Sequence, residues 1–165
     1  MSGLPWIFDD GGRSKAPGFG GVSGSGDCVV RAVTIVTGRP YAEVYAELTD
    51  RQAEFGRTSR SREAKQAARQ PQARHGVFAN VFRAYMLDQG WLWVPTMKIG
   101  TGTTVHLRRG ELPTDLGPLA VQVSRHLTAV VNGAVRDTHD PCRDGNRAVY
   151  GLFMKGGQEP WSPPG

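Results

Sequence analysis

The sequence predicts an α+β protein in which helices come first and strands follow. Helix-like apolar patterns fill the first half of the 165 residues, whereas short apolar runs separated by Gly, Pro or Asn-Gly follow from Trp91 onward. Because helices and strands do not alternate, the order favours an α+β fold over βαβ units. We expect one domain over residues 1–154, with N-terminal helices packed on a C-terminal antiparallel β-sheet, and a disordered tail over 155–165.

Composition bounds the class of protein. Two cysteines do not form a disulfide framework, and no apolar run approaches the length of a membrane span. The start of the chain, from Met1 to Asp10, lacks a basic segment followed by an apolar core, so no secretion signal is expected. We therefore expect a cytoplasmic protein with reduced thiols and no membrane contact.

The first elements lead to a cysteine. Trp6 to Phe8 are costly to expose to water, so an ordered start is expected there. A Gly- and Ser-rich run follows and predicts turns, since it lacks the Gly-Lys-Ser/Thr ending of a phosphate-binding loop. It leads to a segment that starts at Cys28, is apolar at almost every position and stops at Gly38. This pattern predicts a central, largely buried helix with Asp27 as its N-terminal cap.

Cys28 would lie in the first turn of that helix. There the unpaired N–H groups and the positive end of the helix dipole favour a thiolate, so this is where a cysteine nucleophile is usually placed. The alternative is a buried free cysteine that packs as a small apolar side chain.

A second helix and a basic segment come next. The apolar spacing from Tyr41 to Leu48 predicts a helix that ends near Asp50. Residues 51–75 then carry seven Arg or Lys against two Glu, a surplus of five that equals the net charge of +5 of the whole chain. We expect either a partly mobile loop, which we favour, or a solvated helix with one face turned to a partner; its charges are either simply solvated or contact nucleic acid or another polyanion. The candidate contact residues are Arg57, Arg60, Arg62, Lys65 and Arg69.

The remaining elements are a third helix and a set of short strands. Apolar residues on one side predict a helix from Val77 to about Gln89, with Gly90 as its stop. Strand-like runs are then expected at 91–94, 103–107, 119–123, 127–131, 134–138 and 148–153.

A hairpin centred on Asn132-Gly133 holds the most specific feature of the second half. Asn-Gly between two strand-like runs is the strongest short-range hairpin signal, and it places His126 at the mouth of one strand. A two-residue turn would make His126 face His139 and put Asp137 on the same face. A three-residue turn with a bulge would slip the register by one residue and bring Asp140 there instead. The sequence leaves both registers open.

The order of cysteine, histidine and aspartate resembles the papain-like cysteine peptidase superfamily, including its bacteriocin-processing peptidases. The matching positions are the pair Asp27-Cys28, then His126, then the pair Asp140-Pro141. The resemblance implies a papain-like fold and a Cys28–His126–Asp140 triad, with Asp137 as the alternative to Asp140.

The motifs also resemble a second group. The chain looks like bacterial and phage proteins of no established activity that carry Gly-Asp-Cys-Val-x-Arg-Ala, Gly-Trp-x-Trp-x-Pro-Thr-Met and Ser-x-His-Leu-x-Ala-Val-x-x-Gly. These motifs stand here at 26–32, 90–97 and 124–133. This likeness implies the cytoplasm of a bacterial cell or of a phage-infected host.

One position departs from the papain-like pattern. Papain-like enzymes generally have a glutamine six residues before the cysteine that donates to the oxyanion, and Val22 stands there. Ser23, Ser25 or the backbone N–H of Cys28 would have to serve instead.

The leading functional hypothesis is a cysteine hydrolase that acts on a protein or peptide. It would cleave an amide, peptide or isopeptide bond through an acyl-thioester, without a cofactor, and interception by an amine would turn it into a transferase. No metal is expected, because Cys28, His126, His139 and Cys142 lack close ligand spacing. The alternative is a catalytically degenerate scaffold that binds nucleic acid or an acidic protein through residues 51–75.

Overall fold

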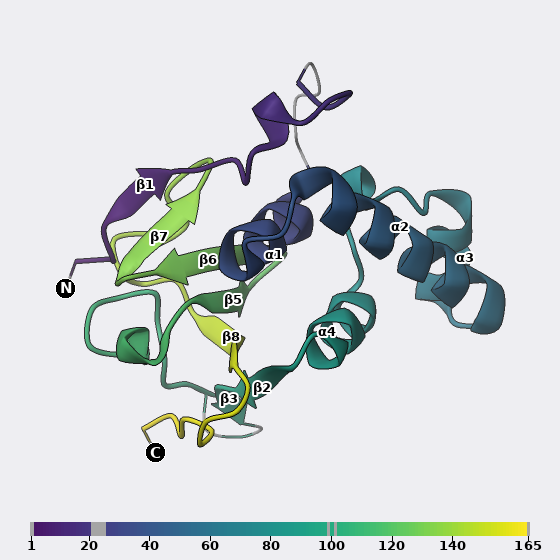
Figure 1. Cartoon of the computed structure of the whole chain (residues 1–165). Helices are drawn as coiled ribbons and strands as arrows, with labels where there is room; N and C mark the ends of the chain where they lie inside the picture. Colours follow the sequence, from purple (N-terminus) through teal and green to yellow (C-terminus); the bar gives the residue numbers. More distant parts are fainter. Residues whose placement is uncertain (1, 21–25, 99, 101, 165) are drawn as a thin grey trace.

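The computed structural model describes residues 2–20, 26–98, 100 and 102–164, and its architecture is α+β, as predicted (Figure 1). Its helices are α1 (Cys28–Thr37), α2 (Tyr41–Thr58), α3 (Arg62–Arg69) and α4 (Ala79–Asp88). Its strands are β1 (Trp6–Phe8), β2 (Trp91–Pro95), β3 (Met97–Lys98), β4 (Gly102–Thr103), β5 (Leu119–Val123), β6 (His126–Val131), β7 (Ala134–Asp137) and β8 (Val149–Lys155). Among the described residues, no helix combines the length and the apolar character needed to cross a membrane.

Six strands form one mixed sheet in the order β1-β7-β6-β5-β8-β2, and β3 pairs with β4 separately. All neighbours in the large sheet are antiparallel except β1, which runs parallel to β7. Helix α1 packs on the middle of this sheet, chiefly against β6, while α3 projects away from it beside α2 (Figure 1). The predicted core of helices on a C-terminal antiparallel sheet is therefore present, with an N-terminal strand added at one edge.

Both faces of the sheet are covered by apolar side chains. Ala120, Leu127 and Phe153 belong to a cluster that includes residues of α1, α2 and α4. Val121 and Leu152, next to them in sequence, belong to a second cluster on loop residues such as Leu107 and Leu112. Because successive strand residues point to opposite faces, helices cover one face and loops cover the other. This double burial holds β5 and β6 rigidly beside α1.

The basic segment is mostly helical. Helix α2 continues to Thr58, eight residues beyond the expected end at Asp50, and α3 follows, so most of 51–75 is helical. The reason is a stripe of small residues: Ala64 and Ala67 are fully buried against α2. Gly56 permits this approach, since a Cβ there would lie 2.7 Å from the backbone nitrogen of Ala68. Because the α2–α3 contact is made by alanines, the sequence of α3 lacks the periodic large apolar residues that usually predict a packed helix.

The tail has contacts with the rest of the chain. Residues 156–164 follow β8, and Trp161 packs against the cluster on the face of the sheet that the loops cover. The Gln158 side chain donates to the Leu116 carbonyl oxygen at 3.1 Å. A tryptophan among the prolines is what ties this segment down.

Two shorter segments depart from expectation. The expected strand at 103–107 reduces to β4 and an isolated bridge between His106 and Ala148. Trp6 to Phe8 are ordered as predicted, but they are held by pairing with β7 and not by burial, because their exposed fractions are 44%, 44% and 65%.

Candidate active site

The β6–β7 hairpin determines which residues face His126. Asn132 and Gly133 have φ values of 52° and 76°, the signature of a two-residue type I′ turn. Val131 accordingly pairs with Ala134, and Val130 with Val135. Continued along the strands, this register puts Asp137 opposite Thr128 and His139 opposite His126.

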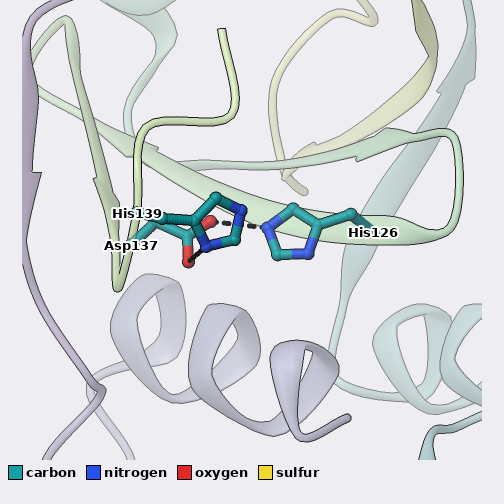
Figure 2. Close-up of side chains that lie close together, drawn as sticks. All are labelled: His126, Asp137 and His139. Atoms are coloured by element: carbon teal, nitrogen blue, oxygen red, sulfur yellow. Dashed lines mark hydrogen bonds and ion pairs between the residues drawn. The ribbon is translucent and has the colours of Figure 1, made fainter. Parts of the chain in front are cut away.

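Asp137 is the carboxylate that contacts His126. His126 Nε2 lies 2.6 Å from Asp137 Oδ2, and the Thr128 hydroxyl donates to the same oxygen at 2.6 Å (Figure 2). The backbone N–H of Thr138 donates to Oδ1 at 2.7 Å. Burial would raise the pKa of Asp137, but the hydrogen bond and charge of His126, aided by Thr128 and Thr138, hold that pKa below its ordinary value. Asp137 is therefore an ionised, fully buried partner of the imidazole.

Asp140, the residue implied by the resemblance, lies elsewhere. Its Oδ1 accepts a hydrogen bond from the backbone N–H of Cys142 at 2.9 Å and closes a local turn. The two-residue turn at Asn132-Gly133 is the reason, because it selects the register that faces His126 with Asp137. Of the two aspartates left open by the sequence, the structure places Asp137 against the histidine.

Cys28 meets the other side of the same ring. Its half-buried thiol makes a side-chain hydrogen bond with His126, and because Nε2 faces Asp137, the ring nitrogen available to sulfur is Nδ1. Burial would raise the pKa of Cys28. The His126 hydrogen bond and charge, the Leu127 backbone N–H and the charge of Arg31 outweigh burial and lower the pKa.

The histidine shows the complementary shift. Burial alone would lower the pKa of His126, but its hydrogen bonds to Asp137 and Cys28 and the charges of both raise that pKa to about 9. A lowered thiol pKa beside a raised imidazole pKa favours a thiolate–imidazolium pair. This arrangement can perform nucleophilic attack and proton transfer.

An ion-pair network supports the site from behind, and no sequence pattern pointed to it. Asp27 is the predicted cap of α1, yet its side chain makes no capping hydrogen bond and accepts from Arg13, Arg31 and Tyr41 instead. The Tyr41 hydroxyl donates to Asp27 at 2.7 Å, and an Arg31 nitrogen lies 3.6 Å from Asp137 Oδ1. Arg31 thus links the residue before the thiol to the residue behind the imidazole.

His139 also lies at the site, although sequence reasoning gave it no role there and only placed it opposite His126 for a two-residue turn. Its ring centroid is 5.0 Å from that of His126, and its Nδ1 is 3.9 Å from Asp137 Oδ1. Among the described residues, His126, Asp137 and His139 form a group whose metal-ligand atoms all lie within 4.8 Å of one another (Figure 2). The hairpin register that pairs His126 with His139 was the signal from which this cluster could have been found.

The other sequence candidates have different places. Ser23 and Ser25, the proposed oxyanion donors, lie outside the described residues. Cys142 is buried in the loop-covered cluster and its thiol faces the Leu4 carbonyl oxygen; burial, together with a hydrogen bond to Asp140, raises its pKa to about 12. The basic candidates are all exposed on α2, α3 or the turn between them: Arg57, Arg60, Arg62, Lys65 and Arg69.

A pocket of about 600 Å³ lies toward the C-terminal end of α1, away from Cys28. Its lining includes Gly11, Ile35, Tyr41 and Arg136, and it contains none of the three residues of the triad. The pocket and the cluster of Cys28, His126 and Asp137 therefore lie at opposite ends of α1.

Comparisons with known proteins give no relative. No protein-family model matches the chain, and neither the curated proteins nor the solved structures contain a match. The geometry of Cys28, His126 and Asp137 is therefore the basis for inferring a function.

Proposed function

We propose that this chain is a papain-like cysteine hydrolase that cleaves an amide, peptide or isopeptide bond of a protein or peptide substrate. The observation that carries the proposal is that one imidazole, His126, interacts with both the Cys28 thiol and the Asp137 carboxylate; since Nε2 faces Asp137, Nδ1 is the nitrogen left for the thiol. A nucleophile, a base and a group that orients the base are what acyl transfer needs.

The reaction follows from these contacts. The Cys28 thiolate attacks the carbonyl carbon, and a sulfur–carbon bond forms as the carbonyl π-electrons move to oxygen. His126 gives its Nδ1 proton to the leaving nitrogen when the carbon–nitrogen bond breaks, which leaves an acyl-thioester. Nδ1 then takes a proton from water, whose oxygen attacks the thioester and releases the thiolate. Asp137 holds the ring by its Nε2–H throughout.

The helix start supplies a donor for the oxyanion. Cys28 is the first residue of α1, so its backbone N–H has no acceptor within the helix. In the proposed mechanism this N–H stabilises the negative oxygen of the tetrahedral intermediate.

The test is the rate at which iodoacetamide alkylates Cys28 between pH 4 and 9 in the presence of a metal chelator. Wild-type protein is expected to show an apparent thiol pKa well below the ordinary value of about 8.5. His126→Ala is expected to raise that pKa, while Cys142→Ser leaves it unchanged because Cys142 is buried in a different cluster. A thiol that titrates like free cysteine in both wild-type and His126→Ala protein would overturn the proposal.

A second candidate function has its own observation. The five candidate cations on α2, α3 and their turn are exposed, and of these only Arg57 forms an ion pair within the described part of the chain, with Glu54. In this alternative the α2–α3 hairpin binds nucleic acid or an acidic protein surface, and the Cys28 site is inactive.

A further inference from the structure

We propose that His126, Asp137 and His139 form a binding site for a divalent transition metal ion, and that the ion switches off His126 as a proton carrier. The site itself is independent of the proposed hydrolase function, whereas its inhibitory consequence rests on that function. Two imidazoles and one carboxylate are a ligand set that zinc takes in open, three-ligand protein sites.

The distances suit such an ion after small side-chain movements. Tetrahedral zinc with bonds of about 2.0–2.1 Å needs ligand atoms about 3.3 Å apart. Here the nitrogens of His126 and His139 that face Asp137 lie 2.6 and 3.9 Å from its two oxygens, one on either side of that spacing. All three ligand atoms lie within 4.8 Å of one another (Figure 2).

Burial and neighbouring groups add to the fit. The side chains of His126 and Asp137 are 11% and 3% exposed, so the surrounding packing holds two of the three ligands in place. His139 is 58% exposed and leaves the fourth position open to water. The Thr128 hydroxyl holds the carboxylate as an outer partner, the arrangement that tunes metal sites. Arg31, 3.6 Å from Asp137, opposes the ion and limits its affinity.

The consequence for His126 follows from counting protons. An ion on Nε2 replaces the proton that this nitrogen shares with Asp137, and that proton goes to solvent. The single remaining ring proton then stays on Nδ1, because its loss would leave an imidazolate. Nδ1 can therefore neither give this proton to the leaving nitrogen nor accept one from water, so both formation and hydrolysis of the acyl-thioester stop.

Zinc ion alone is the probe for the test. Competition with a chromophoric chelator measures its affinity for wild-type protein, for His139→Ala and for His75→Ala, which removes a different exposed histidine. We expect His139→Ala to weaken binding by about tenfold or more and His75→Ala to leave it unchanged. Equal affinities of wild-type and His139→Ala protein would overturn the site.

Two further readouts identify the ligands. Long-range ¹H–¹⁵N correlation spectra should show zinc-dependent shifts at His126 Nε2 and His139 Nδ1, and none at His75 or His106. Cys28→Ala should retain zinc affinity, because the thiol contacts the other nitrogen of His126. Loss of zinc binding in Cys28→Ala would place the ion between sulfur and Nδ1 and refute the site. If Cys28 titrates with an ordinary pKa in the presence of chelator, the proposed hydrolase function is refuted, but the measured zinc affinities are unaffected and still test the metal site.

Discussion

The chemistry of the site depends on a single imidazole whose two nitrogens are committed to different partners. Nε2 faces Asp137, which leaves Nδ1 for Cys28, so one tautomer is favoured before any substrate arrives. Thr128 strengthens this selection, because its hydroxyl occupies the same carboxylate oxygen and fixes its direction. Such preorganisation is what gives general acid–base catalysis its effect.

The first prediction separates the two aspartates. Asp137→Asn removes the charge behind His126, so the imidazolium is less stable and the apparent pKa of Cys28 should rise by about one unit or more. Asp140→Asn should leave that pKa unchanged, because Asp140 only closes a turn with Cys142. The measurement is the pH dependence of Cys28 alkylation in chelator. A shift in Asp140→Asn alone would contradict the assignment of Asp137.

A second prediction concerns the alkaline limb of the pH profile of the proposed hydrolysis. His126 has a pKa raised to about 9, so it keeps the proton that the leaving nitrogen needs up to that pH. Hydrolysis of any substrate found should therefore rise with pH through the lowered pKa of Cys28 and fall again near pH 9. Asp137→Asn should move the alkaline limb to lower pH. A rate that stays constant beyond pH 10 in wild-type protein would contradict this role of His126.

For the individual site residues, the sequence predicted a cysteine, a histidine and an aspartate, but it did not decide between Asp137 and Asp140. Cys28 follows a Gly-rich run and opens an apolar helix, and His126 opens a strand, so both carry strong local signals. The aspartate depends on whether two or three residues form the turn, a difference in backbone angles at Asn132 and Gly133 that Asn-Gly permits in either form.

Among the elements, those with a strong local pattern were predicted well. Helix α1 and the β6–β7 hairpin lie where caps, stops and turn residues mark them. Helix α3 was only one of two alternatives for the basic segment, because its buried face consists of alanines, which give helix propensity without a marked apolar pattern. The α2–α3 pair therefore owes its order to close packing at Gly56, and it carries its charges outward on a rigid surface.

The third prediction concerns that surface. Substituting Arg62, Lys65 and Arg69 by Gln should weaken binding to a heparin column or to double-stranded DNA, if the α2–α3 hairpin binds a polyanion. Removing each cation that pairs with a phosphate should also reduce the slope of log affinity against log salt by about 0.9.

The matched control removes the same charge elsewhere. Three other exposed cations serve for this: Lys15, Arg109 and Arg143. Equally weakened binding in the two triple variants would show that only net charge matters, and unchanged binding in both would refute the binding function of the hairpin.

The whole molecule is held together at the site by contacts between segments far apart in the sequence. The Trp6 indole N–H and the backbone N–H of Asp9 both donate to the Asp137 carbonyl oxygen at 3.0 Å. The parallel pairing of β1 with β7 makes this possible, yet a three-residue strand carries no sequence signal of its partner. Asp27 in the same way joins the N-terminal segment at Arg13 to α1 and to Tyr41 of α2.

The fourth prediction tests this long-range network through Asp27. Asp27→Asn keeps the shape and an acceptor for Tyr41 but removes the charge that balances Arg31, whose side chain is 5% exposed. Breaking a buried ion pair by removing one partner costs about 3–5 kcal/mol of unfolding free energy, and the Asp137 carboxylate, 3.6 Å from Arg31, puts the expected loss at the lower end of that range. Asp88→Asn is the matched control, because Asp88 pairs with Arg51 at the surface and such pairs contribute about 0–1 kcal/mol. Urea denaturation of the wild-type protein and the two variants measures the difference in unfolding free energy.

Equal stability of the two variants would mean that the Asp27 network orders the site without stabilising the fold. The Cys28 pKa of Asp27→Asn would then show whether Arg31 has moved toward Asp137.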